Sequence, residues 1–106
     1  MAAHGVPMVF EWDSAKDTAN QSKHGLSFAL AARVFADSHR IIMEDNRQNY
    51  GEPRFNTTGE VAGILIVTVC HTPRAGVTRL ISARPASHPE RNRYHARQRL
   101  RKTIIG

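Results

Sequence analysis

The sequence predicts an α+β fold in which a small antiparallel β-sheet is flanked by helices, with the element order β-α-α-β-β-β-β-α. The 106 residues, 41% of them hydrophobic, are enough for one globular domain. Four strand-like segments follow one another between residues 40 and 83 with no helix between them. This order lacks the alternation of strands and helices that builds a parallel sheet. We expect a single domain over residues 10–106, preceded by an N-terminal extension, residues 1–9.

The first third of the chain predicts one short strand and two helices. Residues 9–12 are rich in side chains that favour strands. Asp13 is a typical helix N-cap and introduces a helix over residues 14–23. Ser27 is a second N-cap, and apolar side chains recur after it at helical spacing. This second pattern predicts a short amphipathic helix over residues 28–36.

The middle of the chain predicts the sheet. Polar, turn-rich residues over 45–51 predict a loop, and residues 59–60 and 72–76 predict turns. One segment is apolar at nearly every position, as expected for a central strand covered on both faces. The predicted strands of this region are 40–44, 54–58, 64–71 (the apolar one) and 77–83, and the last two form a hairpin.

The C-terminal quarter predicts a basic helix. Ser87 and Glu90 form a capping box, which opens a helix over residues 88–101. Residues 79–106 hold eight Lys or Arg side chains and one acidic residue, whereas residues 1–78 hold seven Lys or Arg side chains and eight acidic residues. Concentrated arginine is typical of proteins that bind a polyanion, above all nucleic acid. An acidic protein partner or a solvated helix face would produce the same pattern.

Other classes of site find little support in the sequence. The single cysteine, Cys70, excludes an internal disulfide and a cysteine cage for zinc. The six histidines are scattered, with no ligand spacing on one element, so we expect no metal and no other cofactor. Cys70 and His71 are adjacent on a strand and therefore point to opposite faces, which favours a core role for Cys70. The longest apolar run, residues 62–70, is about half a membrane span, and the first residues do not resemble a signal peptide. We expect a cytoplasmic protein without membrane contact.

Basic and aromatic side chains remain as candidates for chemistry. Arginines can clamp a phosphodiester and stabilise the extra negative charge of its transition state. RNA carries its own nucleophile, the 2′-OH, so cleavage requires only orientation, positive charge and proton transfer. The candidates are Arg54 and Arg84 as phosphate clamps, His24 or His71 as proton carrier, Tyr94 as a stacking or orienting residue, and Lys23, Arg91, Arg97, Arg99 and Arg101 as RNA-binding side chains.

Each candidate also has a structural explanation. A strand arginine forms a surface ion pair more often than it acts in catalysis, and the basic pair at 23–24 complements a helix dipole. His71 fits a buried core histidine, and Tyr94 fits a core contact of the last helix. Strand parity puts Arg79 and Arg84 on opposite faces unless a β-bulge intervenes, so at most one of the two should line a site.

Several of these residues lie in motifs that resemble the BrnT family. The matching motifs occur in order over about residues 10–95 and are Phe10-Glu-Trp-Asp13, Lys23-His24-Gly25, Glu52-x-Arg54-Phe55, Ile81-Ser-Ala-Arg84 and Glu90-Arg-x-x-Tyr94. BrnT proteins are toxins of bacterial type II toxin–antitoxin pairs with a RelE-like ribonuclease fold. The resemblance therefore implies an endoribonuclease that needs no metal and inhibits translation. It also implies that Arg54 and Arg84 are active-site arginines, with weaker matches at Lys23, His24, Glu52, Arg91 and Tyr94.

The resemblance further implies partners. A BrnA-like antitoxin with a ribbon–helix–helix DNA-binding part would neutralise the toxin, and operator DNA would be bound only through that complex. The RNA substrate would be free or associated with the ribosome. Two alternatives stay open: a non-catalytic nucleic-acid-binding or co-repressor module that acts with a DNA-binding partner, and an assembly subunit whose basic face meets an acidic protein.

Overall fold

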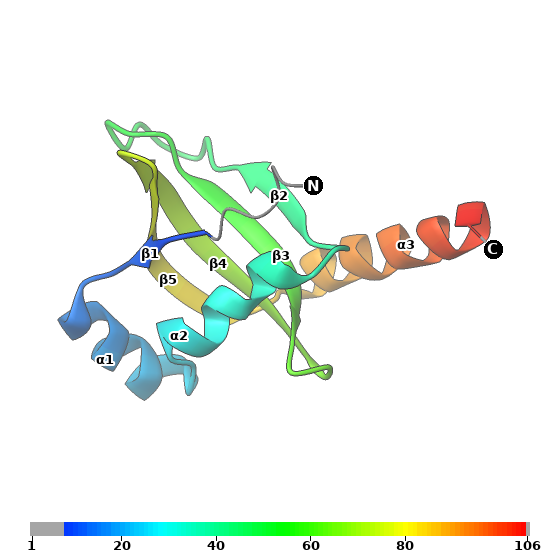
Figure 1. The fold of residues 1–106 in the computed structure, drawn as a ribbon, viewed down its shortest axis with the longest axis horizontal. Coiled ribbons are helices and arrows are strands. Elements are labelled where there is room, and N and C mark those ends of the chain that lie inside the picture. The colour runs from blue at the N-terminus through cyan, green and yellow to red at the C-terminus, as the bar shows by residue number, and fades with distance from the viewer. Residues whose placement is uncertain (1–7, 106) are drawn as a thin grey trace.

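The computed structural model describes the chain from residue 8 to residue 105, and its side chains as far as residue 100. Within this range five strands form one sheet in the order β1-β5-β4-β3-β2, with helices around it (Figure 1). The predicted α+β class is confirmed. Most of the predicted extension and the side chain of Arg101 lie outside the described residues. The elements are β1 (Phe10–Glu11), α1 (Ser14–His24), α2 (Phe28–Ala31), the 3-10 helix η2 (Ala32–Ala36), β2 (Ile41–Glu44), β3 (Phe55–Val61), β4 (Leu65–Arg74), β5 (Val77–Pro85) and α3 (His88–Ile105).

The sheet is mixed rather than wholly antiparallel. Strands β2 to β5 pair antiparallel, whereas the short edge strand β1 pairs parallel to β5, with Phe10 opposite Thr78 and Glu11 opposite Arg79. A parallel pair needs a long connection between its two strands. Here the whole sequence between β1 and β5 supplies it, so the first strand of the chain lies at the edge of the sheet beside the last one.

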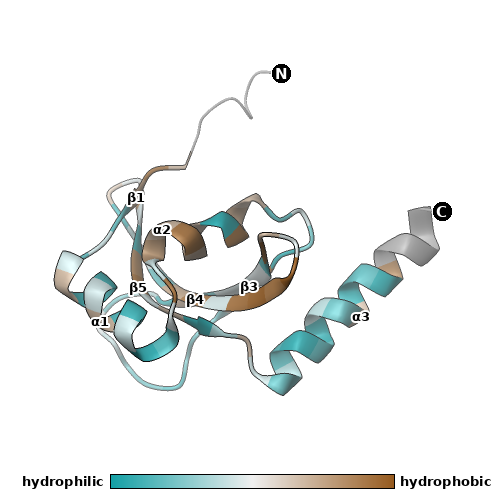
Figure 2. Cartoon of the chain, turned by 90° about the horizontal axis from the view of Figure 1, so that it is seen from below, coloured by the Kyte–Doolittle hydropathy of each residue, from teal (hydrophilic) through white to brown (hydrophobic). Residues whose placement is uncertain are grey.

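The two faces of the sheet differ in their cover. One face packs against α1, α2 and η2 and holds the main core, whereas α3 leaves the sheet as a largely hydrophilic helix (Figure 2). The face opposite the core is therefore partly open, with α3 starting at its border. The buried residues of the core are Leu26, Phe28, Ala31, Val34, Val61, Val67, Val69, Leu80 and Ala83.

The predicted N-caps are present at the starts of the first two helices. The Asp13 carboxylate accepts hydrogen bonds from the backbone N–H groups of Ala15 and Lys16, and Ser27 Oγ accepts one from Leu30 N–H. The second helix is one α-helical turn, α2, that tightens into η2, whereas the sequence predicts one helix over residues 28–36. A final turn of 3-10 geometry is common at the C-terminal end of short helices.

The predicted turn at Gly59-Glu60 is wrong, because both residues lie inside β3, which continues to Val61. A Cβ atom at Gly59 would lie 3.2 Å from the Val34 carbonyl oxygen, so glycine permits the close approach of η2 to the strand. The chain reverses instead at residues 62–64. The glycine at position 59 therefore serves close packing against η2 and not a turn.

A β-bulge divides β5. Cys70 of β4 pairs with Ser82 and the next residue, His71, pairs with Leu80, so that Ile81 has no partner in the register. The extra residue shifts the alternation of side chains by one position. As a result Leu80 and Ala83 are both in the core, and Arg79 and Arg84 share the open face. The strand therefore contains the β-bulge that was the expected exception to strand parity.

Helix α3 is fixed to the rest of the fold near its first turns. The buried Tyr94 hydroxyl donates a hydrogen bond to the Asp37 carboxylate, and the same carboxylate oxygen accepts one from the Glu60 N–H. Tyr94 also packs with Ile66 and Ala86 in a small second cluster. The C-terminal part of the helix extends away from the sheet (Figure 1).

Candidate active site on the open face of the sheet

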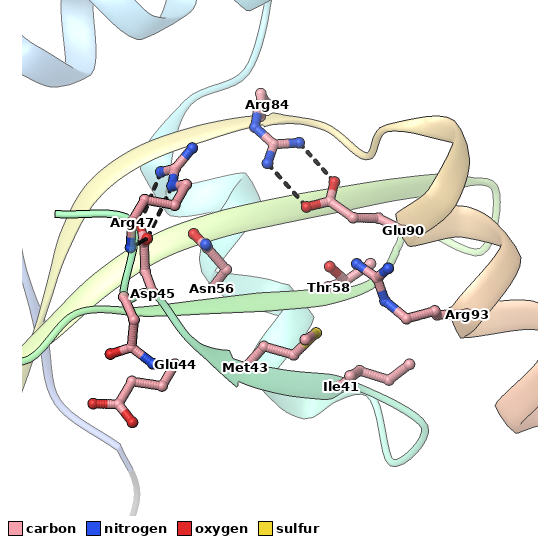
Figure 3. Close-up of a pocket in the computed structure, with 11 residues that line it drawn as sticks. Ile41, Met43, Glu44, Asp45, Arg47, Asn56, Thr58, Arg84, Glu90 and Arg93 are labelled. Carbon is pink, nitrogen blue, oxygen red and sulfur yellow. Dashed lines mark hydrogen bonds and ion pairs between the residues drawn. The ribbon is translucent and has the colours of Figure 1, made fainter.

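Two adjacent cavities lie on the open face. The β2-side cavity, about 220 Å³, lies between β2 and the start of α3, and its lining includes Thr58, Glu90 and Arg93 (Figure 3). The β5-side cavity, about 210 Å³, lies over β3, β4 and β5, and its lining includes Tyr50, Arg54, Cys70 and Ser82. Both cavities share a wall made of Asp45, Arg47, Asn56 and Arg84.

Arg84, at the end of β5, is held by a two-pronged ion pair with Glu90. Its Nη1 lies 2.7 Å from Glu90 Oε1 and its Nη2 lies 2.9 Å from Oε2 (Figure 3). Glu90 Oε1 also accepts hydrogen bonds from Thr68 Oγ1 and from the Ser87 N–H. The predicted capping box thus exists, and its glutamate has a second function. It fixes the guanidinium of Arg84 at the wall between the two cavities.

Arg54 lies just before β3 and reaches the same site. Its Nε donates a hydrogen bond of 3.2 Å to Glu52 Oε2, and its guanidinium carbon lies 4.2 Å from the centre of the Tyr50 ring. Its two terminal nitrogens have no hydrogen-bond partner among the described residues. Stacking and one ion pair therefore orient the side chain, while its two terminal NH₂ groups stay available to a ligand.

The loop between β2 and β3 adds a third arginine. Arg47 Nη2 lies 2.7 Å from the buried carboxylate of Asp45, which also accepts hydrogen bonds from Arg47 Nε and the Tyr50 hydroxyl. The sequence analysis did not select Arg47, Asp45, Tyr50 or Arg93. A polar loop gives no periodic signal, and only the fold brings this loop beside Arg84.

The electrostatics keep these carboxylates ionised. Partial burial raises the pKa of Glu90, but hydrogen bonds from Arg84, Ser87 and Thr68 outweigh it and lower the value to about 2. The hydrogen bonds from Arg47 hold the pKa of Asp45 far below its usual range. Ion pairing in turn raises the pKa of Arg84, so its charge is permanent at any physiological pH.

The structure brings together only two of the predicted catalytic residues, Arg54 and Arg84. His71 lies on the opposite face, where its Nε2 is 2.7 Å from Thr57 Oγ1 and its ring packs 4.9 Å from the ring of Phe35. Burial lowers the pKa of His71 to about 4. Tyr94 is 1% exposed, and burial together with the Asp37 hydrogen bond raises its pKa. Both positions match the structural explanations given above.

The remaining predicted residues lie around the site or away from it. Lys23 and His24 end α1 and line neither cavity. Arg91, Arg97 and Arg99 are exposed on α3. Arg97 lines a shallow hollow beside β2 together with Arg40. Cys70 is half-buried in the β5-side cavity and not in the core, while burial raises the pKa of its thiol.

The described residues contain neither a cluster of metal ligands nor a membrane-spanning helix. Between residues 8 and 100, no three His, Cys, Asp or Glu side chains gather in a way that could hold a metal ion. In the same part of the chain, no helix combines the length and the apolar character needed to span a membrane.

Comparisons with known proteins identify relatives of this chain in sequence and in fold. Residues 12–90 match the family model described as the BrnT ribonuclease toxin of type II toxin–antitoxin systems. The crystal structure of the ribonuclease toxin BrnT from Brucella abortus superposes with a TM-score of 0.62 and is 30% identical in sequence. That match covers 77% of this chain and 100% of the other. No curated protein sequence gives a significant match. The family model spans well over half of the chain, and the chain therefore belongs to the BrnT family of ribonuclease toxins from type II toxin–antitoxin systems.

Proposed function

We propose that this chain is an endoribonuclease that cleaves RNA without a metal ion, and that its active site is the pair of cavities on the open face. The observation that carries the proposal is the meeting of Arg54 and Arg84 in one cavity, with Arg47 beside them. The three arginines come from separate parts of the sequence. Each is oriented by its own carboxylate, namely Glu52, Glu90 and Asp45.

The proposed chemistry uses the 2′-OH of the RNA. The 2′-oxygen attacks the adjacent phosphorus, the bond from that phosphorus to the 5′-oxygen of the next nucleotide breaks, and a 2′,3′-cyclic phosphate and a 5′-hydroxyl end are formed. The arginines stabilise the additional negative charge that develops on the phosphoryl oxygens. The guanidiniums are fixed before the substrate arrives, so little reorganisation is needed in the transition state. The proton released from the 2′-OH passes to solvent water, and the departing 5′-oxygen takes a proton from solvent. His24 and His71 line neither cavity, so the proposal gives them no part in this proton transfer.

The family supports the wider role. A type II toxin has a protein antitoxin as partner, and we propose a BrnA-like ribbon–helix–helix protein that neutralises the enzyme and connects it to operator DNA. Cleavage of RNA in the cytoplasm, free or on the ribosome, would inhibit translation. The basic side chains of α3 would add affinity for the RNA backbone.

The test compares the wild-type protein with Arg54→Ala/Arg84→Ala after induced expression in a bacterial host. We expect growth arrest and fragmented RNA for the wild type only. Arg79→Ala is the matched control, because Arg79 lies on the same strand and face but pairs with Glu11 and lines neither cavity. Thermal unfolding of each purified protein checks that it is folded. Cleavage by the purified wild type should persist in excess chelator.

A folded double variant with full toxicity would overturn the site, and loss of cleavage in chelator would overturn metal independence. The second candidate function is a nucleic-acid-binding or co-repressor module, which the exposed arginines of α3 favour. In that case wild-type protein would bind RNA without cutting it. Replacing Arg91, Arg97 and Arg99 by Gln would then abolish function, while Arg54→Ala/Arg84→Ala would have no effect.

A further inference from the structure

Asn56 is the one residue of the shared wall that has no protein partner for its side chain. It is the second residue of β3 and lies opposite Cys70 of β4 and Met43 of β2. Within the described part of the chain, its amide makes no hydrogen bond, although it is half-buried between the two cavities. Its neighbours Asp45, Arg47 and Arg84 are all engaged in ion pairs. Figure 3 shows Asn56 between Arg47 and the Arg84–Glu90 pair.

An amide in this position has unused hydrogen-bonding capacity. Its carbonyl oxygen accepts and its NH₂ group donates, side by side. That pattern complements the N6 amino group and N7 of adenine, and an asparagine that makes both bonds discriminates well against the other bases. In single-stranded RNA the bases are unstacked and both edges are open to such contacts.

The β5-side cavity also has a flat wall against which a base could stack. Arg54 lies over the Tyr50 ring at 4.2 Å, and both side chains line this cavity. Guanidinium planes and aromatic rings are the usual stacking partners of unpaired bases. The remaining sides include the small side chains of Cys70 and Ser82, which leave room beside Asn56.

The shared wall fixes where the base must lie relative to the phosphate. Arg84 and Arg54 bind the scissile phosphate in the proposed function, and Asn56 lines the same cavity as both. A base held in this cavity therefore belongs to a nucleotide directly attached to that phosphate. We propose that the β5-side cavity is a nucleobase subsite in which Asn56 reads adenine next to the cleaved bond. This inference rests on the proposed ribonuclease function.

The test uses oligodeoxynucleotides that contain one ribonucleotide, because only its 2′-OH can attack and the cut position is therefore known. One set varies the base of the ribonucleotide, and a second set varies the base that follows it. For the wild type we expect the adenine substrate of one set to be cleaved roughly 5- to 150-fold faster than the others. Asn56→Ala should bring the four rates together by slowing the adenine substrate alone.

Asn92→Ala is the matched control, since Asn92 is an exposed amide on α3 that lines neither cavity. Asn56→Ala removes no hydrogen bond from the fold, and thermal unfolding verifies its stability. Base preference that survives in Asn56→Ala, or an equal rate for all bases in the wild type, would overturn the inference while leaving the ribonuclease function intact.

A binding measurement separates the inference from the proposed function. Dinucleotides with a 2′-O-methyl group cannot be cleaved, and their affinity is measured by nuclear magnetic resonance titration of the wild type and of Asn56→Ala. Tighter binding of the adenine dinucleotide by the wild type alone supports the subsite even if no RNA is cut. Equal affinities for all bases would overturn it.

Discussion

At the scale of single residues, three of the arginines that line the cavities are each paired with a carboxylate, and this pairing determines which N–H groups they can offer to a ligand. The pairs Arg47–Asp45, Arg54–Glu52 and Arg84–Glu90 each carry no net charge. In the proposed function, the site would therefore bind a phosphate less by its total charge than by N–H groups held in position. Orientation of this kind favours the transition state over loose binding of any polyanion.

The buried histidine gives a prediction about stability and pH. The pKa of His71 is about 4 in the folded protein, against an ordinary value of 6.5, because burial disfavours the charged ring. Below pH 6.5 the unfolded chain therefore takes up a proton that the folded chain does not, and stability falls until about pH 4. We expect the wild type to lose about 1–2 kcal/mol of unfolding free energy between pH 7 and pH 5.

Urea unfolding at the two pH values measures this loss. His71→Gln should be less stable at pH 7 but should lose clearly less on acidification, whereas His88→Gln, at an exposed position, should behave as the wild type. The same pH dependence in His71→Gln would contradict the assignment. Carboxylates with lowered pKa values, such as Asp37 and Glu90, add their own loss at more acid pH.

The sequence predicted the arginines of the site better than their neighbours. Arg54 and Arg84 stand at strand ends, where a side chain can be assigned to an edge of the sheet from the pattern alone. Asp45 and Arg47 could not be predicted, because their place in the candidate site depends on a loop conformation in which the Arg47 guanidinium donates hydrogen bonds to the Asp45 carboxylate. His71 shows the converse case, in which the residue type suggested chemistry and only the face of the strand excluded it.

At the scale of elements, α3 depends on few contacts. Among the described elements it packs mainly against β3, and Tyr94 connects it to Asp37 and through Asp37 to the edge of that strand. Glu90, one turn earlier, connects the same helix to Arg84. The attachment of the helix and the orientation of Arg84 therefore both depend on the first turns of α3.

Removal of the Tyr94 hydroxyl tests this attachment. Tyr94→Phe should reduce the unfolding free energy by about 1.5–3 kcal/mol, because a buried hydrogen bond to a charged carboxylate is lost. Urea unfolding measures the change, and hydrogen exchange should show α3 opening more readily. The variant should keep its rate of RNA cleavage under conditions in which it is folded. A folded Tyr94→Phe protein of unchanged stability but lost cleavage would instead support the catalytic role expected from the sequence.

The positions of the elements were predictable where caps and periodicity agreed. Asp13 and Ser27 begin helices as expected, because a side-chain cap is a local interaction. Gly59 shows the limit of local reasoning, since its role depends on a helix that crosses the strand at close range. The parallel pairing of β1 depends on the completed sheet, so no local pattern contains it.

At the scale of the whole molecule, positive charge is concentrated in one projecting helix. The chain carries a formal net charge of +6, and Arg91, Arg97 and Arg99 of α3 line neither of the two cavities. In the proposed function, this arrangement would separate long-range attraction of RNA from the chemistry of cleavage. It also leaves an exposed basic surface to which an acidic segment of an antitoxin could bind.

The salt dependence of RNA binding tests the separation. Replacing Arg91, Arg97 and Arg99 by Gln should reduce the slope of log affinity against log salt by about 2 for single-stranded RNA, if each arginine neutralises one phosphate. The rate of cleavage at saturating RNA should change little. Fluorescence titration at several salt concentrations measures the slope. An unchanged slope would show that α3 takes no part in binding, and a lost cleavage rate would contradict the separation.

The bulge at Ile81 has a consequence for chain length. If Ile81 is removed, the remaining residues of β5 alternate regularly between the two faces, with Leu80 and Ala83 inward and Ser82 and Arg84 outward. The strand can therefore contain or lack this one residue while the Arg84 side chain stays on the open face. A relative that lacks this residue would keep its arginine on the same face, although a count of positions along its strand would suggest the opposite.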